Sequence, residues 1–286
     1  MAALRQLLKP IVTPLVHPLR GSVTWACQRG LLSSETRRFF PWAWVTEPFT
    51  IHGDGWRCRW FPTEFDTVGH RIFWSGFHQW EKETIPVILD NLRNARCFMD
   101  IGANCGIYTV LGCTLNPQLK GVAIEPVPKI YTALKNNVDQ NGFAPRIQVL
   151  NLAVGDRNGV VPFHEAEDAT QGSLAEQGYA GQKGRLIQVR CTTLDALVEE
   201  LQIEPDFLKI DVEGFEHAVI EGAAGVLKRF RPRIVLEANP TDLTDPINEG
   251  LSEAGYNFYN ITDRGPVQRS AIDPVHEFRN WLCIPA

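Results

Sequence analysis

The chain has 286 residues, a formal net charge of −5 and a hydrophobic fraction of 44%, values typical of a soluble globular protein rather than a fibrous or disordered one. A general nucleic-acid binder needs a basic face that displaces counterions, so the negative charge predicts no nucleic-acid partner. The seven cysteines include no C-x-x-C pair, which is typical of a reducing compartment and argues against a disulfide framework. We therefore expect a cytoplasmic location.

Residues 1–21 contain only short apolar stretches, which are interrupted by Pro10, Pro14 and Pro18. These stretches are too short for a signal-peptide core or for a membrane span of about 20 apolar residues, so we expect no transmembrane segment. Packing on the folded domain and lying on a membrane surface both remain open. The small number of basic residues favours packing.

Residues 1–80 are predicted to form an N-terminal extension or cap that faces the substrate. This region holds six of the eight tryptophans, namely Trp42, Trp44, Trp56, Trp60, Trp74 and Trp80. The stretch FTIHGDGWRCRWF predicts a β-hairpin that turns at residues 52–55. In one interpretation Trp74 and Trp80 offer flat apolar surfaces to an acceptor, and in the other they form the core of a small cap.

Residues 81–286 are predicted to form a second, larger domain in which strands and helices alternate. The predicted strands cover residues 97–104, 121–127, 146–156, 186–193, 205–214, 231–239, 256–262 and 277–285. The predicted helices cover residues 82–94, 107–116, 128–142, 194–201, 216–230 and 245–256. This alternation predicts an α/β fold with a Rossmann-like, doubly wound and mostly parallel sheet. The polar segment 160–184 is too long for a simple connection, so we expect a functional loop that shapes the acceptor pocket around residues 168–183.

A glycine loop, DIGANCG at residues 100–106, follows the first of these strands. In an open α/β sheet a nucleotide-like ligand binds at this turn. Gly102 and Gly106 would let the backbone approach the ligand, but their spacing differs from the G-x-G-x-x-G of dinucleotide-binding proteins. Asp100 would repel a pyrophosphate and suits a ligand that carries an ammonium and a sulfonium. The other interpretation is a tight turn before a packed helix, and Cys105 is interpreted as a buried thiol.

Acidic residues follow two other predicted strands. Glu125 ends the second strand, where a carboxylate can accept hydrogen bonds from both hydroxyls of a ribose, and a solvated carboxylate is the alternative. Asp211, Glu213 and Glu216 follow a core strand and could hold a substrate, accept a proton or contribute to a metal site. Glu216 has a second interpretation, in which its charge favours the start of the next helix.

Five motifs occur in the order DIGANCGIYT, AIEPVP, LAVGD, FLKIDVEGFE and RPRIVLEAN. Together they resemble the signature of the FkbM-type methyltransferases, and the resemblance covers roughly residues 80–286. The resemblance implies a sheet of the class I methyltransferase type and S-adenosylmethionine as the cofactor. It also implies methyl transfer to a hydroxyl oxygen of a small-molecule acceptor such as a sugar, a polyketide or another metabolite, including a glycosylated one.

The resemblance further implies cofactor-binding roles for individual residues. Those that would bind the methionine end are Asp100, Gly102, Asn104 and Gly106. Glu125 would bind the ribose, and Asn151 and Ala153 would lie near the adenine.

The same resemblance places Asp211 and Glu213 close to the sulfonium and the acceptor, so Asp211 is a cofactor-binding candidate and both are catalytic candidates. Relatives often have a histidine where this chain has Asn239, so a histidine base is not available there. In one hypothesis, oxygen ligands from Asp211, Glu237 and Asn239 hold Mg²⁺, which lowers the pKa of the acceptor hydroxyl. In the competing, metal-free hypothesis Asp211 or Glu213 is the base, or Asp211 only steadies the sulfonium.

Two other functions remain open at this point. An NAD-dependent oxidoreductase or epimerase would use a similar sheet, although the middle glycine of its fingerprint is missing. A non-catalytic protein that binds S-adenosylmethionine would keep the same motifs. The sequence predicts no particular oligomeric state.

Overall fold

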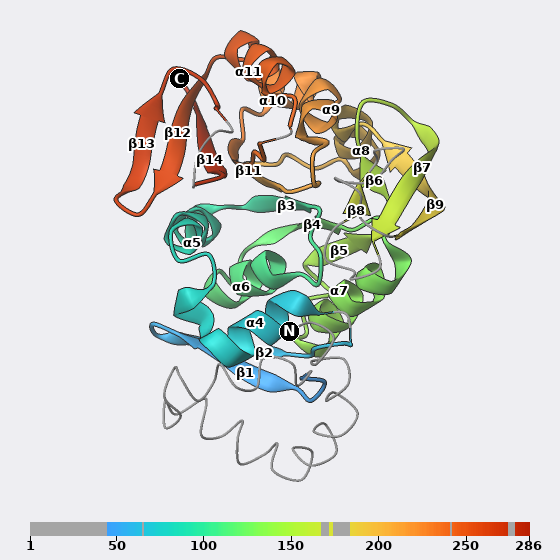
Figure 1. Cartoon of the computed structure of the whole chain (residues 1–286), viewed down its shortest axis with the longest axis vertical. Coiled ribbons are helices and arrows are strands. Elements are labelled where there is room, and N and C mark those ends of the chain that lie inside the picture. Colours follow the sequence, from blue (N-terminus) through green and yellow to red (C-terminus); the bar gives the residue numbers. More distant parts are fainter. Residues whose placement is uncertain (1–44, 65, 167–171, 174–183, 241, 274–277) are drawn as a thin grey trace, which may run out of the picture. The chain divides into compact units, whose positions relative to one another are not determined.

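Figure 1 shows the computed structural model of the protein, which describes residues 45–286 apart from residues 65, 167–171, 174–183, 241 and 274–277. The predictions for residues 1–44, including Trp42 and Trp44, and for most of the loop at 168–183 lie outside the described residues. The chain divides into two compact units, Met1–Glu81 and Lys82–Ala286.

The described part of the first unit is a β-hairpin followed by two short helices. Its elements are β1 (Phe49–Gly53), β2 (Trp56–Trp60), α4 (Thr67–Ser75) and the 3-10 helix η2 (Phe77–Gln79). The antiparallel pairing of β1 with β2 confirms the predicted hairpin, whereas the sequence pattern does not predict α4. Asp66 is the N-cap of helix α4. Its carboxylate accepts hydrogen bonds from the Gly69 amide at 2.7 Å and from the Trp60 indole N–H.

Trp74 and Trp80, the two candidates for an acceptor platform, are buried, as is Trp60 of β2. Trp60, Trp74 and Trp80 expose 0%, 6% and 7% of their surface. The Trp74 ring meets the Phe73 ring edge-on, with 5.0 Å between the ring centroids. This burial favours the interpretation of these rings as core residues.

The second unit is built on an eight-stranded sheet with the strand order β13-β12-β14-β11-β10-β3-β4-β5. Its strands are β3 (Cys97–Ile101), β4 (Lys120–Ile124), β5 (Ile147–Leu150), β10 (Phe207–Ile210), β11 (Arg233–Glu237), β12 (Tyr256–Thr262), β13 (Gly265–Arg269) and β14 (Asn280–Pro285). Within this sheet, β11, β10, β3, β4 and β5 pair in parallel, each with its neighbour. The pairs β11–β14, β14–β12 and β12–β13 are antiparallel. This mostly parallel sheet confirms the predicted α/β fold.

Helices cover both faces of the sheet (Figure 1). On one side lie α5 (Thr84–Asn94), α6 (Ile107–Leu115) and α7 (Pro128–Gln140). On the other side lie α8 (Leu194–Leu201), α9 (Glu216–Glu221), α10 (Ala224–Arg229) and α11 (Thr244–Glu253). Within the part of the chain that the structure describes, no helix is long and apolar enough to cross a membrane.

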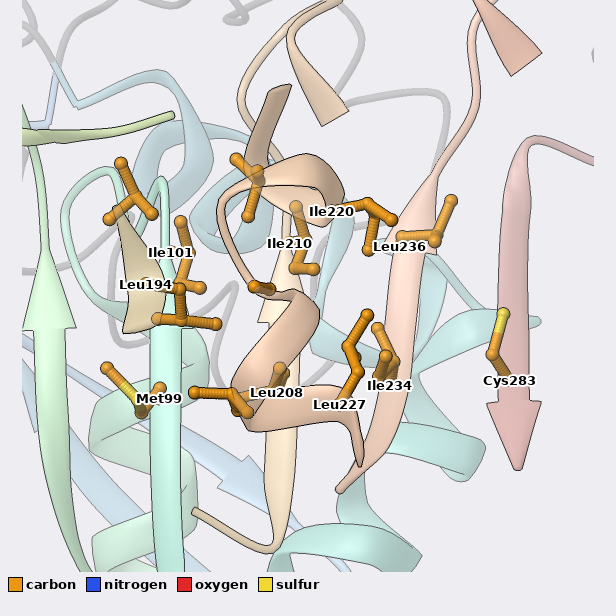
Figure 2. Packing of buried hydrophobic residues seen from close by; sticks show 14 of the residues in the cluster. Met99, Ile101, Leu194, Leu208, Ile210, Ile220, Leu227, Ile234, Leu236 and Cys283 are labelled. Carbon is orange, nitrogen blue, oxygen red and sulfur yellow. The ribbon is translucent and has the colours of Figure 1, made fainter. Parts of the chain in front are cut away.

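The main hydrophobic core lies between the sheet and the second group of helices. Alternate residues of neighbouring strands point to this side, and Figure 2 shows Met99, Leu208 and Ile234 in one row with Leu227 of α10 against them. All four are almost completely buried. Because side chains alternate along a strand, the residues that precede and follow Met99, Leu208 and Ile234 point to the opposite face of the sheet, toward α5 and α6.

Strands between residues 153 and 192 form a separate four-stranded sheet with the order β6-β9-β7-β8. Three sequence predictions are therefore wrong in detail, and the first is the loop predicted over 160–184, because its residues 160–166 belong to a strand. The strands of this sheet are β6 (Ala153–Val154), β7 (Gly159–Ala166), β8 (Gly172–Ser173) and β9 (Gly184–Thr192). The strand predicted over 146–156 is divided between the two sheets. β5 ends at Leu150, and the side-chain amide of the next residue, Asn151, donates to the carbonyls of Glu125 and Pro126 at 2.8 and 2.9 Å. The strand predicted over 186–193 pairs antiparallel with β7 rather than joining the large sheet.

The helix predicted over 216–230 is broken into α9 and α10 at Gly222. The Gly222 carbonyl accepts a hydrogen bond from the Asp195 amide at 2.9 Å, outside the helical pattern. A Cβ atom at Gly222 would lie 2.0 Å from the Gly155 carbonyl oxygen. The chain therefore turns here because it packs directly on a neighbouring backbone, a constraint that helical periodicity does not encode.

Candidate active site

The glycine loop begins where β3 ends and leads into α6. The amides of Gly102 and Ala103 both donate to the Ile124 carbonyl of β4, at 3.0 and 2.9 Å. Gly102, Asn104 and Gly106 have positive φ angles of 79°, 51° and 89°. These left-handed residues turn the chain tightly away from the strand, a conformation that glycine adopts without strain.

Gly102 also lies against the loop that follows β10. A Cβ atom at Gly102 would lie 1.8 Å from the carbonyl oxygen of Asp211, which is part of the backbone and cannot rotate away. The Asp211 amide in turn donates to the Ile101 carbonyl at 3.0 Å. The glycine loop and the acidic loop are thus in direct backbone contact.

Glu125 lies at the carboxyl end of β4 and is 5% exposed. Its Oε2 accepts a hydrogen bond from the Asn104 amide at 3.1 Å, and its Oε1 accepts one from the Val127 amide at 3.0 Å. Burial raises the pKa of Glu125 to about 7, although these two amide donors oppose the shift. The carboxylate therefore joins the glycine loop to the end of β4, and each oxygen keeps a second lone pair for a ligand.

Asp100 is the penultimate residue of β3 and is 1% exposed. The Thr109 hydroxyl of α6 donates to its Oδ2 at 2.6 Å. Among the described residues, no hydrogen-bond donor reaches its Oδ1. Burial raises the pKa of Asp100 to about 6, and the Thr109 hydrogen bond and the positive charge of Lys209 limit this rise.

The acidic loop that follows β10 is held by Glu216, the first residue of α9. The fully buried Glu216 accepts hydrogen bonds from the Val212 amide at 2.9 Å and from the Gly214 amide at 3.0 Å. Between these donors, Glu213 has a positive φ of 54°, which is strained for a residue with a Cβ atom. Glu216 thus begins the helix and also fixes the loop that carries Asp211 and Glu213.

Acidic side chains are concentrated around Glu213. Burial raises the pKa of Glu213 far above its usual range, and the charges of Asp211, Glu237 and Glu216 raise it further. Burial also raises the pKa of Glu216 to about 8. Several carboxyl groups at the ends of β3, β4 and β10 therefore bind protons more tightly than they would in water, and a cationic ligand would favour their ionised forms.

The end of β11 carries two of the residues in the metal hypothesis, Glu237 and Asn239. The Asn239 side-chain oxygen accepts a hydrogen bond from Arg279 at 3.0 Å, so a positive charge already lies against it. Within the described ranges, no three His, Cys, Asp or Glu residues are grouped so that they could hold a metal ion. Asn239 is therefore poorly suited to bind a second cation.

The structure brings Asp100, Gly102, Asn104, Glu125 and Asp211 together at the carboxyl ends of adjacent strands. The two residues expected near the adenine follow β5: the Asn151 side-chain amide donates to backbone carbonyls, and Ala153 is a buried residue of β6, so their role near the adenine stays a prediction.

The sequence analysis did not identify three residues that contact the predicted site residues: Thr109, Lys209 and Arg279. Thr109 is not recognisable from a motif, because its contact depends on the first turn of α6 lying beside Asp100. Lys209 could have been found, because a charged residue within the apolar strand FLKI is unusual. The position of Arg279 follows only from the pairing of β14 with β11.

The sequence matches the family described as "Methyltransferase FkbM domain" over residues 100–258, a range that starts at Asp100 and ends in β12. The chain belongs to the FkbM methyltransferase family. The match includes the glycine loop, Glu125 and the acidic loop.

Several characterised proteins are similar to this chain at low identity. The hexuronic acid methyltransferase AglP of Haloferax volcanii is 24% identical over 176 residues, which are 59% of this chain and 68% of AglP. The 2-O-methyltransferase NoeI of Sinorhizobium fredii is 28% identical over 149 residues, 46% of this chain and 59% of NoeI. The AMB antimetabolite synthetase AmbE of Pseudomonas aeruginosa is 25% identical over 191 residues, 54% of this chain but only 9% of AmbE.

Among solved structures, a methyltransferase FkbM from Methylobacillus flagellatus is similar, with 18% identity and a TM-score of 0.46. The similarity covers 78% of this chain and 55% of that structure.

The contact between Gly102 and the Asp211 carbonyl predicts that Gly102→Ala weakens binding of S-adenosylmethionine at least tenfold, a loss of about 1.4 kcal/mol. Gly142→Ala is the matched control, because Gly142 also has a positive φ, 74°, but no atom of the described residues lies within 4 Å of its Cβ position. Both variants share the backbone strain, and only Gly102→Ala displaces the acidic loop. Thermal unfolding measures the loss of stability that the backbone strain causes in each variant. Calorimetry measures the affinity of each variant for S-adenosylmethionine. Equal affinities in the two variants would contradict the prediction.

The raised pKa values predict that the ligand-free protein loses stability as the pH rises from about 5 to 8. Over this range the folded state binds more protons at Asp100, Glu125 and Glu216 than the unfolded state, so the free energy of unfolding decreases with pH. Glu125→Gln should reduce the decrease by an amount on the order of 3 kcal/mol. Urea unfolding at a series of pH values measures it, with Glu253→Gln on the exposed end of α11 as the control. If the free energy of unfolding falls with pH as steeply in Glu125→Gln as in the wild type, Glu125 does not have a raised pKa in the folded state.

Proposed function

We propose that this chain transfers a methyl group from S-adenosylmethionine to a hydroxyl oxygen of a small-molecule acceptor. The observation that carries the proposal is the convergence of the glycine loop, buried Glu125 and the acidic loop at the carboxyl ends of β3, β4 and β10. Ligands of open α/β sheets bind at this edge. Membership of the FkbM methyltransferase family supports the same reaction.

The residues at this edge fit the chemical groups of S-adenosylmethionine. Glu125 has lone pairs for the two ribose hydroxyls, and Asp100 has a buried oxygen that no described hydrogen-bond donor reaches. The raised pKa values of both acids indicate a site that favours a ligand with positive charges. When bound, S-adenosylmethionine supplies a methyl group that its sulfonium already activates, so the protein has to orient the acceptor and exclude water.

The residues that would act on the acceptor are Asp211 and Glu213. A carboxylate can accept the proton of the acceptor hydroxyl, and it does so best when its pKa lies near the working pH. The surroundings of Glu213 raise its pKa, and the positive charge of a bound sulfonium would favour its ionised form, which is the form that accepts a proton. Asp211, beside Gly102, would then steady the sulfonium.

The acceptor in our proposal is a hydroxyl on a sugar or another small metabolite. AglP is named for a hexuronic acid and NoeI for a 2-O-methyl transfer, and both names fit an acceptor of this kind. The formal net charge of −5 supports a small acceptor over a nucleic acid, because a general nucleic-acid binder needs a basic face.

A dinucleotide-dependent oxidoreductase is the main alternative. Tyr131 and Lys135 of α7 have the Tyr-x-x-x-Lys spacing used by some of these enzymes, but Lys135 lies on the exposed side of α7 and pairs with Asp139 at 2.5 Å. Calorimetry with S-adenosylmethionine and with NAD separates the two functions. A panel of sugars and uronic acids, with S-adenosylhomocysteine formation as the readout, separates an enzyme from a non-catalytic binding protein.

We predict that Glu125→Ala weakens S-adenosylmethionine binding by about 1–3 kcal/mol, because the ribose hydroxyls and the Asn104 amide lose their acceptor. The measurement is calorimetry on protein whose fold is checked by circular dichroism. Glu253→Ala, an exposed substitution on α11, should bind normally. Unchanged affinity in a folded Glu125→Ala protein would remove Glu125 from the cofactor site.

We predict that methyl transfer survives exhaustive EDTA treatment, because Arg279 already occupies the side-chain oxygen of Asn239 that the Mg²⁺ hypothesis requires. The rate of S-adenosylhomocysteine formation is compared before treatment, after treatment and after Mg²⁺ is restored. A loss of activity that Mg²⁺ reverses would contradict this prediction and favour a site that includes Asp211 and Glu237.

A further inference from the structure

A lysine lies fully buried in the central strand β10. Lys209 is 1% exposed and is surrounded in sequence by Phe207, Leu208 and Ile210. Strands that are covered on both faces normally consist of apolar residues, because a buried ammonium loses its hydration. None of the roles proposed for Glu125, Asp211 and Glu213 uses this charge.

Lys209 faces the side of the sheet opposite to the main core. Its neighbours in the chain, Leu208 and Ile210, point toward α9 and α10 in Figure 2, so the Lys209 side chain points toward α6. There its Nζ lies 5.8 Å from the centre of the Tyr108 ring, within the range of a cation–π interaction. Lys209 is paired in register with Asp100 of β3.

The ammonium of Lys209 also reaches the acidic loop. Its Nζ lies 3.3 Å from Oδ2 of Asp211, whose side chain is 28% exposed, and 3.3 Å from the Ile210 carbonyl oxygen. A buried cation therefore contacts a carboxylate that is partly exposed to solvent at the end of the strand. An ion pair with one buried partner restricts the carboxylate more than a pair between two flexible surface side chains.

These contacts distinguish Lys209 from a residue that only stabilises the fold. An apolar side chain at this position would continue the apolar strand and would not have to be removed from water as a charge. Violations of local sequence rules of this kind occur mainly at functional sites. The group that Lys209 can influence there is Asp211.

We propose that Lys209 is a positioning residue that fixes the Asp211 carboxylate at the end of β10, so that Asp211 acts on the cofactor in a defined orientation. The inference rests on the proposed function, since Asp211 is the group assigned to the sulfonium. It adds a residue that does not contact the ligand but acts through one that does.

A double-mutant cycle tests this inference by measuring S-adenosylmethionine affinity in four proteins: wild type, Lys209→Met, Asp211→Asn and the double variant. Lys209→Met keeps a similar volume and removes the charge. The direct repulsion between Lys209 and a sulfonium is present in both halves of the cycle and cancels. We expect Lys209→Met to change the dissociation constant by one factor in the wild-type background and by another in the Asp211→Asn background, and the two factors should differ at least fivefold.

Turnover gives a second readout once an acceptor is found. We expect Lys209→Met to lower kcat about tenfold with the acceptor KM changed less than threefold, and to have little further effect in the Asp211→Asn protein. Lys228→Met, an exposed lysine of α10, is the matched control and should be unchanged. If Lys209→Met does not fold, the cycle is run with Asp100→Asn in all four proteins, which removes the buried carboxylate that would otherwise lack its counter-charge.

The outcomes separate the inference from the proposed function. Equal factors in the two backgrounds would overturn the role of Lys209, because its effect would then not pass through Asp211. The same holds if the effects on kcat multiply. If the wild-type protein binds no S-adenosylmethionine, the proposed function is contradicted and the inference falls with it.

Discussion

The contact between Gly102 and the carbonyl oxygen of Asp211 determines how the rest of the site is arranged. Two parallel strands, β3 and β10, end at the same level, and their loops would collide if the first loop carried a side chain at this position. The glycine lets the backbones meet, and the hydrogen bond from the Asp211 amide to Ile101 holds them at this distance. As a result, the glycine loop and the acidic loop cannot move independently.

Buried carboxylates fix the backbone around this contact. Glu125 accepts hydrogen bonds from Asn104 and Val127, and Glu216 accepts them from Val212 and Gly214. Each uses its two oxygens to satisfy two backbone amides of a loop that lies beyond the end of its strand. The same burial raises their pKa values, so the groups that shape the site also make it receptive to positive charge.

The sequence was sufficient for the main architecture, because parallel strands and amphipathic helices follow directly from hydrophobic periodicity. It was also sufficient to single out Gly102, Glu125 and Asp211, since glycine turns and acids at strand ends are local features. The four-stranded sheet and the break at Gly222 could not be predicted in this way, because both depend on contacts between distant backbone segments. The second role of Glu216 needed the structure too, because a helix-start acid and a loop-holding acid have the same sequence pattern.

The position of β14 has a consequence for how the protein forms during synthesis. β14 inserts between β11 and β12, although it follows both in the chain. The pairing of β11 and β12 with β14 cannot begin until residues 280–285 have left the ribosome, whereas β3, β4 and β5 can pair much earlier. In the interval one edge of β11 and one of β12 present unpaired backbone groups, so the nascent chain exposes two sites for incorrect strand pairing until β14 has emerged from the ribosome.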